Sequence, residues 1–400
     1  MWELIRANQR RSHLLLMAMA LLLLATGLAV GELLLQEPIW GLFAAMGLWL
    51  VLTELAFRTG DKVLLAISGA RRIAKKDHPV LFNLVEEMTV AHGLPKAPGI
   101  YILDEAAPNA FATGTKPEKS AVVITSGLLE RLSRDELQGV VAHELAHIKH
   151  RDVVYLTQMA VMVGGVVLLA ELARRVLFYG GGNRRRTSSK SRGADPIYLL
   201  AILLILIAPL VSRLMYLALS RKREYLADAA AAVATRYPEG LASALEKIEQ
   251  QWTPMARANP VTAPMFIVNP ITRAVKAVET LFSTHPPTSE RIRILRSFGA
   301  SVSYADYDRA FRQVTGRPVG LVPAAALGIS AAPVRSPIQD SRTPQERLRQ
   351  STDLLWRLAG YSFILCSCGT ILKVPPVYRG QELPCPQCGR LHKVHNPNTA

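Results

Sequence analysis

The chain has 400 residues, of which half are hydrophobic and 20% are charged, and its mean hydropathy is +0.19. This length allows two or more domains with a sizeable core, and the composition favours a membrane protein. The net charge of +16 suits nucleic acid or an anionic membrane surface and does not choose between them. All four cysteines lie between Cys366 and Cys388, which argues against a disulfide framework and indicates a metal site in a reducing compartment.

Two apolar runs open the chain. Residues 12–31 are uncharged, and twenty such residues are the length that a helix needs to cross a bilayer. A second run, residues 38–53, follows almost at once without a convincing signal-peptide cleavage site. We therefore predict a retained transmembrane hairpin in residues 1–60. The positive-inside rule places both ends of the hairpin in the cytoplasm, because positive charges flank it on both sides. These are Arg6, Arg10, Arg11, Arg58, Lys62, Arg71 and Arg72.

The stretch that follows has the pattern of a soluble α/β domain. Helical spacing in residues 78–93 precedes a short strand at 99–105, and the sequences AFATG and SAVVITSG predict a strand pair around a turn. The next segment, SRDELQGVVAHELAHIKH, begins with a capping box formed by Ser133 and Glu136. This segment is therefore predicted to be a helix.

That helix carries the pattern of a metal site. His143 and His147 lie one turn apart on one face, so both imidazoles can bind one zinc ion, and Glu144 can reach a water bound to that ion. His150 shares the face but lies about 10 Å along the axis from His143. A tetrahedral ion needs its third ligand from another direction, so His150 is the weaker candidate.

A distant carboxylate is expected to complete the ligand set. Glu224, in the helical segment SRKREYLAD, fits this role, and Asp228 follows one turn later on the same face. With that spacing, Glu224 can bind zinc while Asp228 accepts a hydrogen bond from a ligand imidazole. A Glu and an Asp on a charged helix are by themselves more often only solvated.

Two further apolar runs, residues 153–170 and 196–212, predict a hydrophobic hairpin at 153–219 that interrupts the domain. The loop between them is rich in arginine, which the positive-inside rule would keep in the cytoplasm. The apolar runs favour two crossings, and we expect a spanning hairpin. The fold expected is membrane-embedded and mainly helical, with four hydrophobic helices.

Four motifs together resemble one family: PNAFATG, HELAHIKHRD, SRKREYLADAAAA and STHPPTSERI. They are similar to the integral-membrane zinc peptidases, which include the bacterial heat-shock protease HtpX and the eukaryotic prenyl-protein endopeptidases. The resemblance covers roughly residues 14–296 and implies an α+β zincin-type domain at 61–300, with a motif-bearing helix, a downstream helix that carries the glutamate, and a small substrate-binding sheet.

The resemblance also implies residue roles. The zinc ligands would be His143, His147 and Glu224, and Glu144 would be the general base. His285 and Arg291 match an element near the transition state, where His285 is a candidate oxyanion donor. The remaining matches form an edge strand for the substrate backbone: Asn109, Ala110, Phe111, Ala112 and Thr113.

The end of the chain departs from this pattern. Residues 301–350 are rich in Pro, Ala, Ser and Arg and predict a flexible linker, and residues 351–400 form a cysteine-bearing module. Four thiolates would hold a structural zinc in a ribbon, namely those of Cys366, Cys368, Cys385 and Cys388. His392 and His395 are alternative ligands. The tail lacks a basic patch with interleaved aromatics, so nucleic acid is not expected, and a docking or regulatory protein partner is favoured.

The function expected is a zinc-dependent endopeptidase of the cell membrane, with one catalytic and one structural zinc, whose site and ribbon face the cytoplasm. Its partners would be the bilayer and an extended or unfolded polypeptide, which fits membrane-protein quality control. Rival interpretations are a non-catalytic zinc scaffold and a membrane-tethered nucleic-acid-binding protein. Glu144 argues against the scaffold, because a structural zinc needs ligands but no base.

Overall fold

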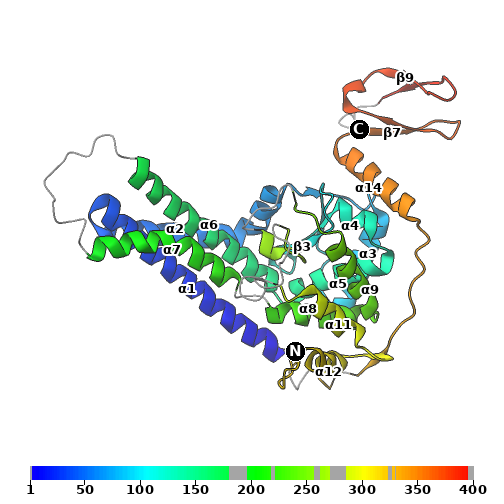
Figure 1. The fold of residues 1–400 in the computed structure, drawn as a ribbon. Helices are drawn as coiled ribbons and strands as arrows, with labels where there is room; N and C mark the ends of the chain where they lie inside the picture. Colours follow the sequence, from blue (N-terminus) through cyan, green and yellow to red (C-terminus); the bar gives the residue numbers. More distant parts are fainter. Residues whose placement is uncertain are drawn as a thin grey trace.

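The structure, a computed structural model, has three parts: a long helical arm, a rounded domain, and a small module on a helical strut (Figure 1). The arginine-rich loop and His395 lie outside the described residues, which are 2–179, 196–217, 221–255, 262–270, 285–322, 327–328 and 330–394.

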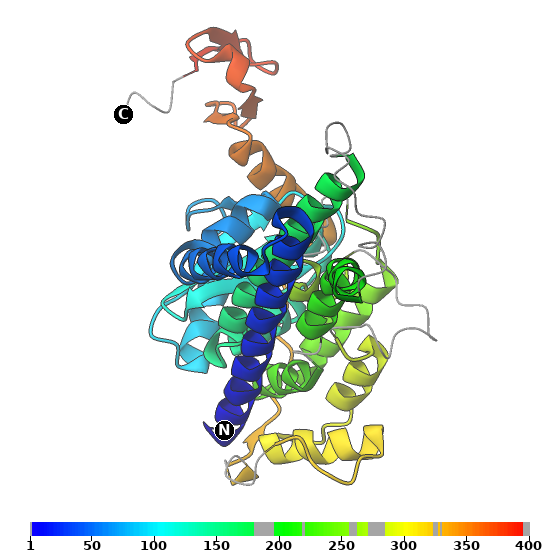
Figure 2. The ribbon, with the colours of Figure 1, turned by 90° about the vertical axis from the view of Figure 1, so that its left-hand side faces the viewer.

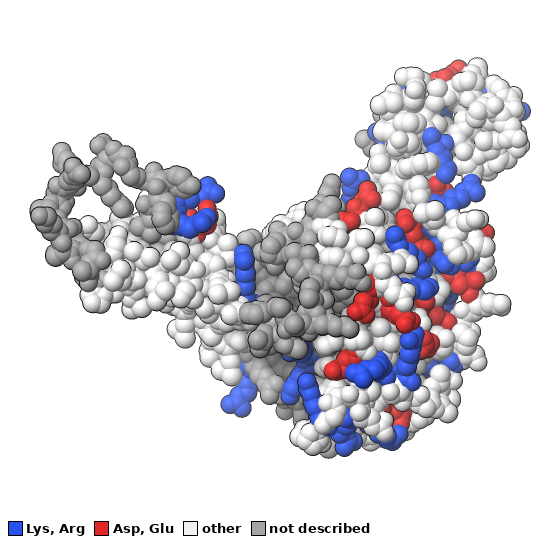
Figure 3. Space-filling view, viewed as in Figure 1, with Lys and Arg blue, Asp and Glu red and all other residues white. Residues whose placement is uncertain are grey.

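The arm consists of four helices packed side by side (Figures 1 and 2): α1 (Trp2–Leu35), α2 (Pro38–Ser68), α6 (Asp152–Tyr179) and α7 (Pro196–Leu217). Each contains a stretch that is long and apolar enough to cross a membrane. In α1 and α2, Gly31 and Gly41 meet so closely that neither position has room for a Cβ, the kind of small-residue contact that lets membrane helices approach. Few charged side chains lie on the arm, whereas both signs cover the domain (Figure 3).

A four-stranded sheet lies beside the arm in the order β1-β2-β4-β3. The strands are β1 (Arg71–Arg72), β2 (Gly99–Leu103), β3 (Ala110–Lys116) and β4 (Lys119–Thr125). The predicted strand pair is confirmed, because β3 and β4 form an antiparallel hairpin. Strand β3 lies at the edge of the sheet.

Helix α5 (Arg134–Lys149) runs through the centre of the domain, and its residues from Asp135 to Ile148 are all buried. The predicted capping box is present, and the backbone N–H of Ser133 donates to the Glu136 carboxylate (2.8 Å). Around α5 pack the sheet and three helices, α3 (Pro79–His92), α8 (Arg221–Thr235) and α9 (Pro238–Gln250). Helix α11 (Thr288–Arg296) packs on α9 and α8. A Cβ at Gly139 would lie 2.6 Å from the Leu241 backbone of α9.

The junction between the domain and the arm is very short. Helix α5 is capped by His150, and α6 begins at Asp152, so only Arg151 separates the cap from the next helix. Arg151 has φ = 62°, in the left-handed region, where residues other than glycine, asparagine and aspartate are uncommon. The helix that carries the histidines is therefore followed, after one strained residue, by a helix that is long and apolar enough to cross a membrane.

The region predicted as a flexible linker, 301–350, is instead packed against the domain, so that prediction is wrong for much of its length. Residues Tyr304–Thr315 form helix α12, which buries Tyr307 and Phe311. Further along, the Arg335 guanidinium donates to the Asp135 carboxylate (2.7 Å) and to the Thr235 carbonyl (2.9 Å). These long-range hydrogen bonds fix a segment whose composition carries no local period.

Helix α14 (Pro344–Leu358) rests on α4 (Ser126–Arg131) and carries the C-terminal module away from the domain (Figure 2). The module is made of two hairpins, one from β7 (Ser362–Leu365) and β8 (Ile371–Val374), the other from β9 (Glu382–Pro384) and β10 (Leu391–Lys393). The turns of these hairpins bring the four cysteines together.

Candidate active site

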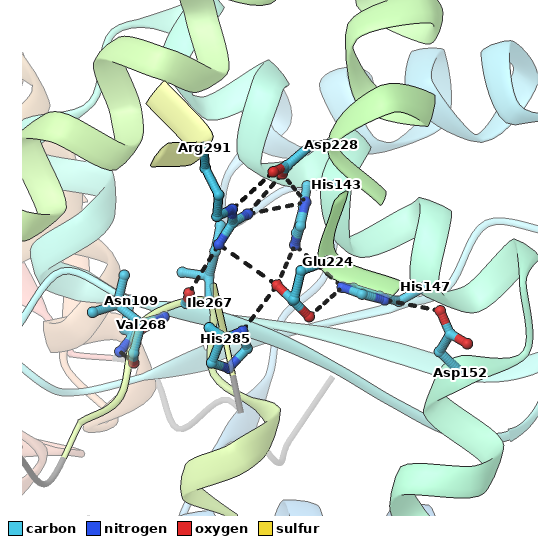
Figure 4. A network of polar contacts seen from close by, with 10 residues as sticks. All are labelled: Asn109, His143, His147, Asp152, Glu224, Asp228, Ile267, Val268, His285 and Arg291. Atoms are coloured by element: carbon cyan, nitrogen blue, oxygen red, sulfur yellow. Dashed lines mark hydrogen bonds and ion pairs between the residues drawn. The ribbon is translucent and has the colours of Figure 1, made fainter. Parts of the chain in front are cut away.

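Helices α5 and α8 bring three ligand atoms to one point, as Figure 4 shows. The Nε2 atoms of His143 and His147 lie 3.2 Å apart. The Glu224 carboxylate lies 3.5 Å from His143 Nε2 and 3.4 Å from His147 Nε2. Zinc bonds to nitrogen and oxygen of about 2.1 Å imply a tetrahedral edge of about 3.4 Å, so these three residues fit the ion.

Each histidine is held from behind by a carboxylate. His143 Nδ1 lies 2.9 Å from Asp228 Oδ1, and His147 Nδ1 lies 3.2 Å from Asp152 Oδ2. Carboxylates in this position fix the tautomer and the orientation of ligand imidazoles, with Nδ1–H donating and Nε2 free for the metal. Asp228 was expected there from the sequence. The role of Asp152 was missed, although it stands in the quoted motif HELAHIKHRD.

Arg291 lies behind the ligand set. Its buried guanidinium donates to both oxygens of Asp228 (2.8 and 2.7 Å) and lies 3.5 Å from the Glu224 carboxylate. Since Asp228 is fully buried, this ion pair compensates a charge that would otherwise be costly. The structure therefore places Arg291 where it supports Asp228 and, through it, His143.

Glu144 and His285 line one small cavity together with His147 and Glu224. Burial raises the pKa of the Glu144 carboxyl above its ordinary value, although the neighbouring histidines oppose the shift. A raised pKa suits a carboxylate that must take up a proton. The His285 Nδ1 atom lies 2.9 Å from Glu224 Oε2, so the structure brings His285 to the ligand set, as the sequence predicted.

The edge strand predicted for substrate is covered by a segment of the same chain. The Ile267 N–H donates to the Ala110 carbonyl (2.9 Å), which makes an antiparallel bridge between Phe111 and Phe266, whose rings lie 4.7 Å apart. The Asn109 amide nitrogen donates to the Val268 carbonyl (2.8 Å). The covering segment was not anticipated, because no sequence pattern marks it as a strand.

The same segment also narrows the catalytic cavity. The short helix η2 (Ala263–Met265) contributes Pro264 and Met265 to the wall that faces Glu144. The cavity measures only about 10 Å³, close to the least that holds a single water. This space is too small for a peptide.

His150 stays outside the ligand set. It caps α5, and burial lowers the pKa of its imidazole to about 4. Among the described residues, a second group with metal-ligand chemistry consists of the four cysteines of the module, whose sulfurs all lie within 4.8 Å of one another. The Cys366–Cys388 and Cys368–Cys385 sulfur distances are 3.5 and 3.7 Å. Zinc–sulfur bonds of about 2.3 Å imply edges of about 3.8 Å, so the four thiolates fit a tetrahedral ion.

Comparison with known proteins agrees with this geometry. Residues 75–298 match Peptidase family M48. A protease HtpX homolog of Dictyoglomus turgidum is 43% identical over 298 residues, covering 74% of this chain and 95% of the relative. One from Pyrococcus furiosus is 42% identical over 273 residues, covering 68% and 91%. A crystal structure of S. mikatae Ste24p covers 74% of this chain and 67% of its own, with 17% identity and a TM-score of 0.40. The chain therefore belongs to peptidase family M48, whose metalloproteases use zinc.

Proposed function

We propose that this membrane-bound zinc endopeptidase degrades unfolded segments of membrane proteins, with His143, His147 and Glu224 as zinc ligands and Glu144 as the general base. The observation that carries the proposal is that the three ligand atoms converge within tetrahedral distances while Glu144 lines the same cavity. A scaffold would need the ligands but would gain nothing from a buried base.

The chain's own residues would perform the proton transfers. When bound, zinc polarises the scissile carbonyl and acidifies water. Glu144 takes the proton of the attacking water and delivers it to the leaving amine. Its raised pKa helps it hold that proton between the two steps.

His285 is the proposed donor to the oxyanion. It lines the cavity beside Glu144, and its Nδ1 faces the Glu224 carboxylate. From this position an N–H of its ring can donate to charge that develops on the scissile carbonyl oxygen.

The substrate would bind as an additional strand on β3 and replace the covering segment. Ile267 already makes the main-chain hydrogen bond that an incoming strand would make to Ala110, so the segment shows that this edge accepts an antiparallel partner. Strand addition requires an extended peptide, which a folded protein does not offer. Damaged or unfolded membrane proteins meet this requirement.

A cleavage assay tests the proposal directly. The purified full chain, loaded with zinc, is incubated with an unfolded model protein, and Glu144→Gln serves as the matched variant. We expect cleavage by the wild type and none by the variant at equal zinc content. Equal cleavage by both would overturn the assignment of the base.

We further infer that the active site and the ribbon face the cytoplasm. The positive flanks of the first hairpin support this orientation. A cysteine placed at Ser188, in a background without native cysteines, tests the second hairpin. Labelling of intact cells by an impermeant thiol reagent would support spanning, whereas labelling only after lysis would mean that these helices do not cross.

The ribbon is proposed to hold a structural zinc and to dock a protein partner. The described part of the module exposes Leu365, Val377 and Leu391, which are 71%, 74% and 62% accessible. These apolar side chains are available for contact with a partner.

A further inference from the structure

A second cavity, of about 840 Å³, lies where the arm meets the catalytic domain. Its walls come from three arm helices, namely residues 13–20 of α1, 49–57 of α2 and 154–162 of α6, together with the turn between β3 and β4. The cavity therefore lies between apolar helices of the arm, which joins the domain in Figure 1, and a polar turn of the domain. The proposed catalytic steps do not use this cavity.

The two sides of the cavity differ in character. The arm contributes an apolar wall made of Leu16, Met17, Ala20, Trp49, Phe57 and Met162. The domain side contributes Lys116 at the end of β3 and Arg151 at the α5–α6 junction, with Tyr155 and Gln158 below them on α6. Such a surface suits an amphiphile that has a charged head and an apolar tail.

The cations in this wall are available to a ligand. Lys116 and Arg151 are exposed, and within the described ranges neither forms an ion pair with a carboxylate. Glu118 also lines the wall but contacts neither cation closely enough to pair. Arg151 is held in the left-handed region, which sets the direction in which its side chain leaves the backbone.

We propose that this cavity binds one anionic glycerophospholipid from the leaflet on the side of the domain. The phosphate would lie on Lys116 and Arg151, and an acyl chain would lie against the apolar wall between α1 and α2. Inorganic phosphate would leave the apolar wall uncovered.

Native mass spectrometry of the detergent-solubilised full chain tests the proposal, with titrations of phosphatidylglycerol and of phosphatidylcholine. The Glu144→Gln protein is used throughout, so the readout does not depend on hydrolysis. We compare Lys116→Gln/Arg151→Gln with a control of equal charge change, Lys76→Gln/Lys96→Gln, whose lysines are exposed elsewhere on the domain. We expect tighter binding of phosphatidylglycerol, an at least ten-fold loss in the first variant, and no change in the control.

A third variant separates the lipid from other occupants. Ala20→Phe fills the apolar wall and leaves both cations in place, so it should also weaken phosphatidylglycerol binding. Equal binding of the two lipids, or equal loss in both charge variants, would overturn the proposal. Competition by inorganic phosphate at the same affinity as the lipid would also overturn it. A further contradicting result would be an Ala20→Phe variant that still binds the lipid but, when Glu144 is restored, cleaves a membrane-anchored substrate more slowly.

Discussion

The Asp152 carboxylate lies 3.2 Å from the Nδ1 atom of His147, on the side of the ring opposite the ligand cluster (Figure 4). It matches the position of Asp228 behind His143. Both imidazoles are therefore oriented by a buried carboxylate.

Asp152→Ala is expected to weaken zinc binding by 10- to 100-fold, because His147 loses the acceptor that fixes its tautomer. Competition with a chromogenic chelator measures the affinity, and thermal melting checks that the variant is folded. Asp104→Ala, which removes an exposed carboxylate, should bind zinc as the wild type does. An unchanged affinity in the Asp152 variant would remove this residue from the site.

Two substitutions should separate the base from the ligands. Glu144→Gln is expected to retain catalytic zinc and to lose at least ~10²-fold in hydrolysis, because it removes only proton transfer. Glu224→Ala should lose both metal and activity. Metal analysis with single-turnover cleavage distinguishes the two. If the Glu224 variant kept its zinc, the third ligand would lie elsewhere.

A disulfide should lock the covering segment in place. Phe111 and Phe266 are bridge partners, and facing residues of an antiparallel pair have Cβ atoms about 4.5–5.5 Å apart, within reach of a bond after a small shift. In a background with the native cysteines changed to serine, Phe111→Cys/Phe266→Cys should be inactive when oxidised and regain cleavage after reduction. The control is the same background without the pair. Full activity of the oxidised protein would show that substrate does not displace the segment.

The four cysteines should hold a second zinc ion. The full chain is expected to contain two zinc ions, and Cys385→Ser one, without loss of cleavage activity. Metal counting by plasma emission measures this directly. A count of one in both proteins would show that the sulfurs, although close together, bind no ion.

His92 should make the domain sensitive to acid. Its Nε2–H donates to the Ala142 carbonyl (2.7 Å), and burial lowers its pKa to about 3. Below pH 6.5 His92 therefore binds a proton in the unfolded chain but stays neutral in the folded chain. The free energy of unfolding then falls by about 1.4 kcal/mol for each unit that the pH drops between 6.5 and 3.

His92→Gln removes this proton. The variant should be less stable than the parent at pH 7.5, and the difference should shrink by about 2 kcal/mol at pH 5. Urea unfolding of the Glu144→Gln protein at both pH values measures the change without self-cleavage. A difference that is constant with pH would show that His92 does not stay neutral in the folded chain.

The ligands could be predicted because helical spacing carries them: His143 with His147, and Glu224 with Asp228, share faces that a period of 3.6 defines. Asp152 could not be placed this way. It lies beyond the left-handed Arg151, where the helical period ends and the next side chain points in a direction that spacing does not give.

Long-range contacts explain the other differences. Arg335 bonds to residues 100 and 200 positions away, and Ile267 meets Ala110 across more than 150. Neither contact produces a periodic pattern in the sequence. The packed segment 301–350 was therefore predicted to be a flexible linker, and the edge of β3 was predicted to bind substrate, with no segment of the chain covering it. Composition predicts local backbone preference, whereas these segments are held by tertiary hydrogen bonds.

The single residue between the α5 cap and α6 has a further consequence. Helix α5 is joined through Arg151 alone to an apolar helix of membrane-spanning length, so we expect a bilayer that holds α6 also to fix the depth and tilt of α5. The active site would then stay at a constant distance from the membrane surface. Peptide bonds at that distance would reach it more readily than bonds nearer or farther. Cleavage sites in anchored substrates should cluster at a constant number of residues from the end of the substrate's own span.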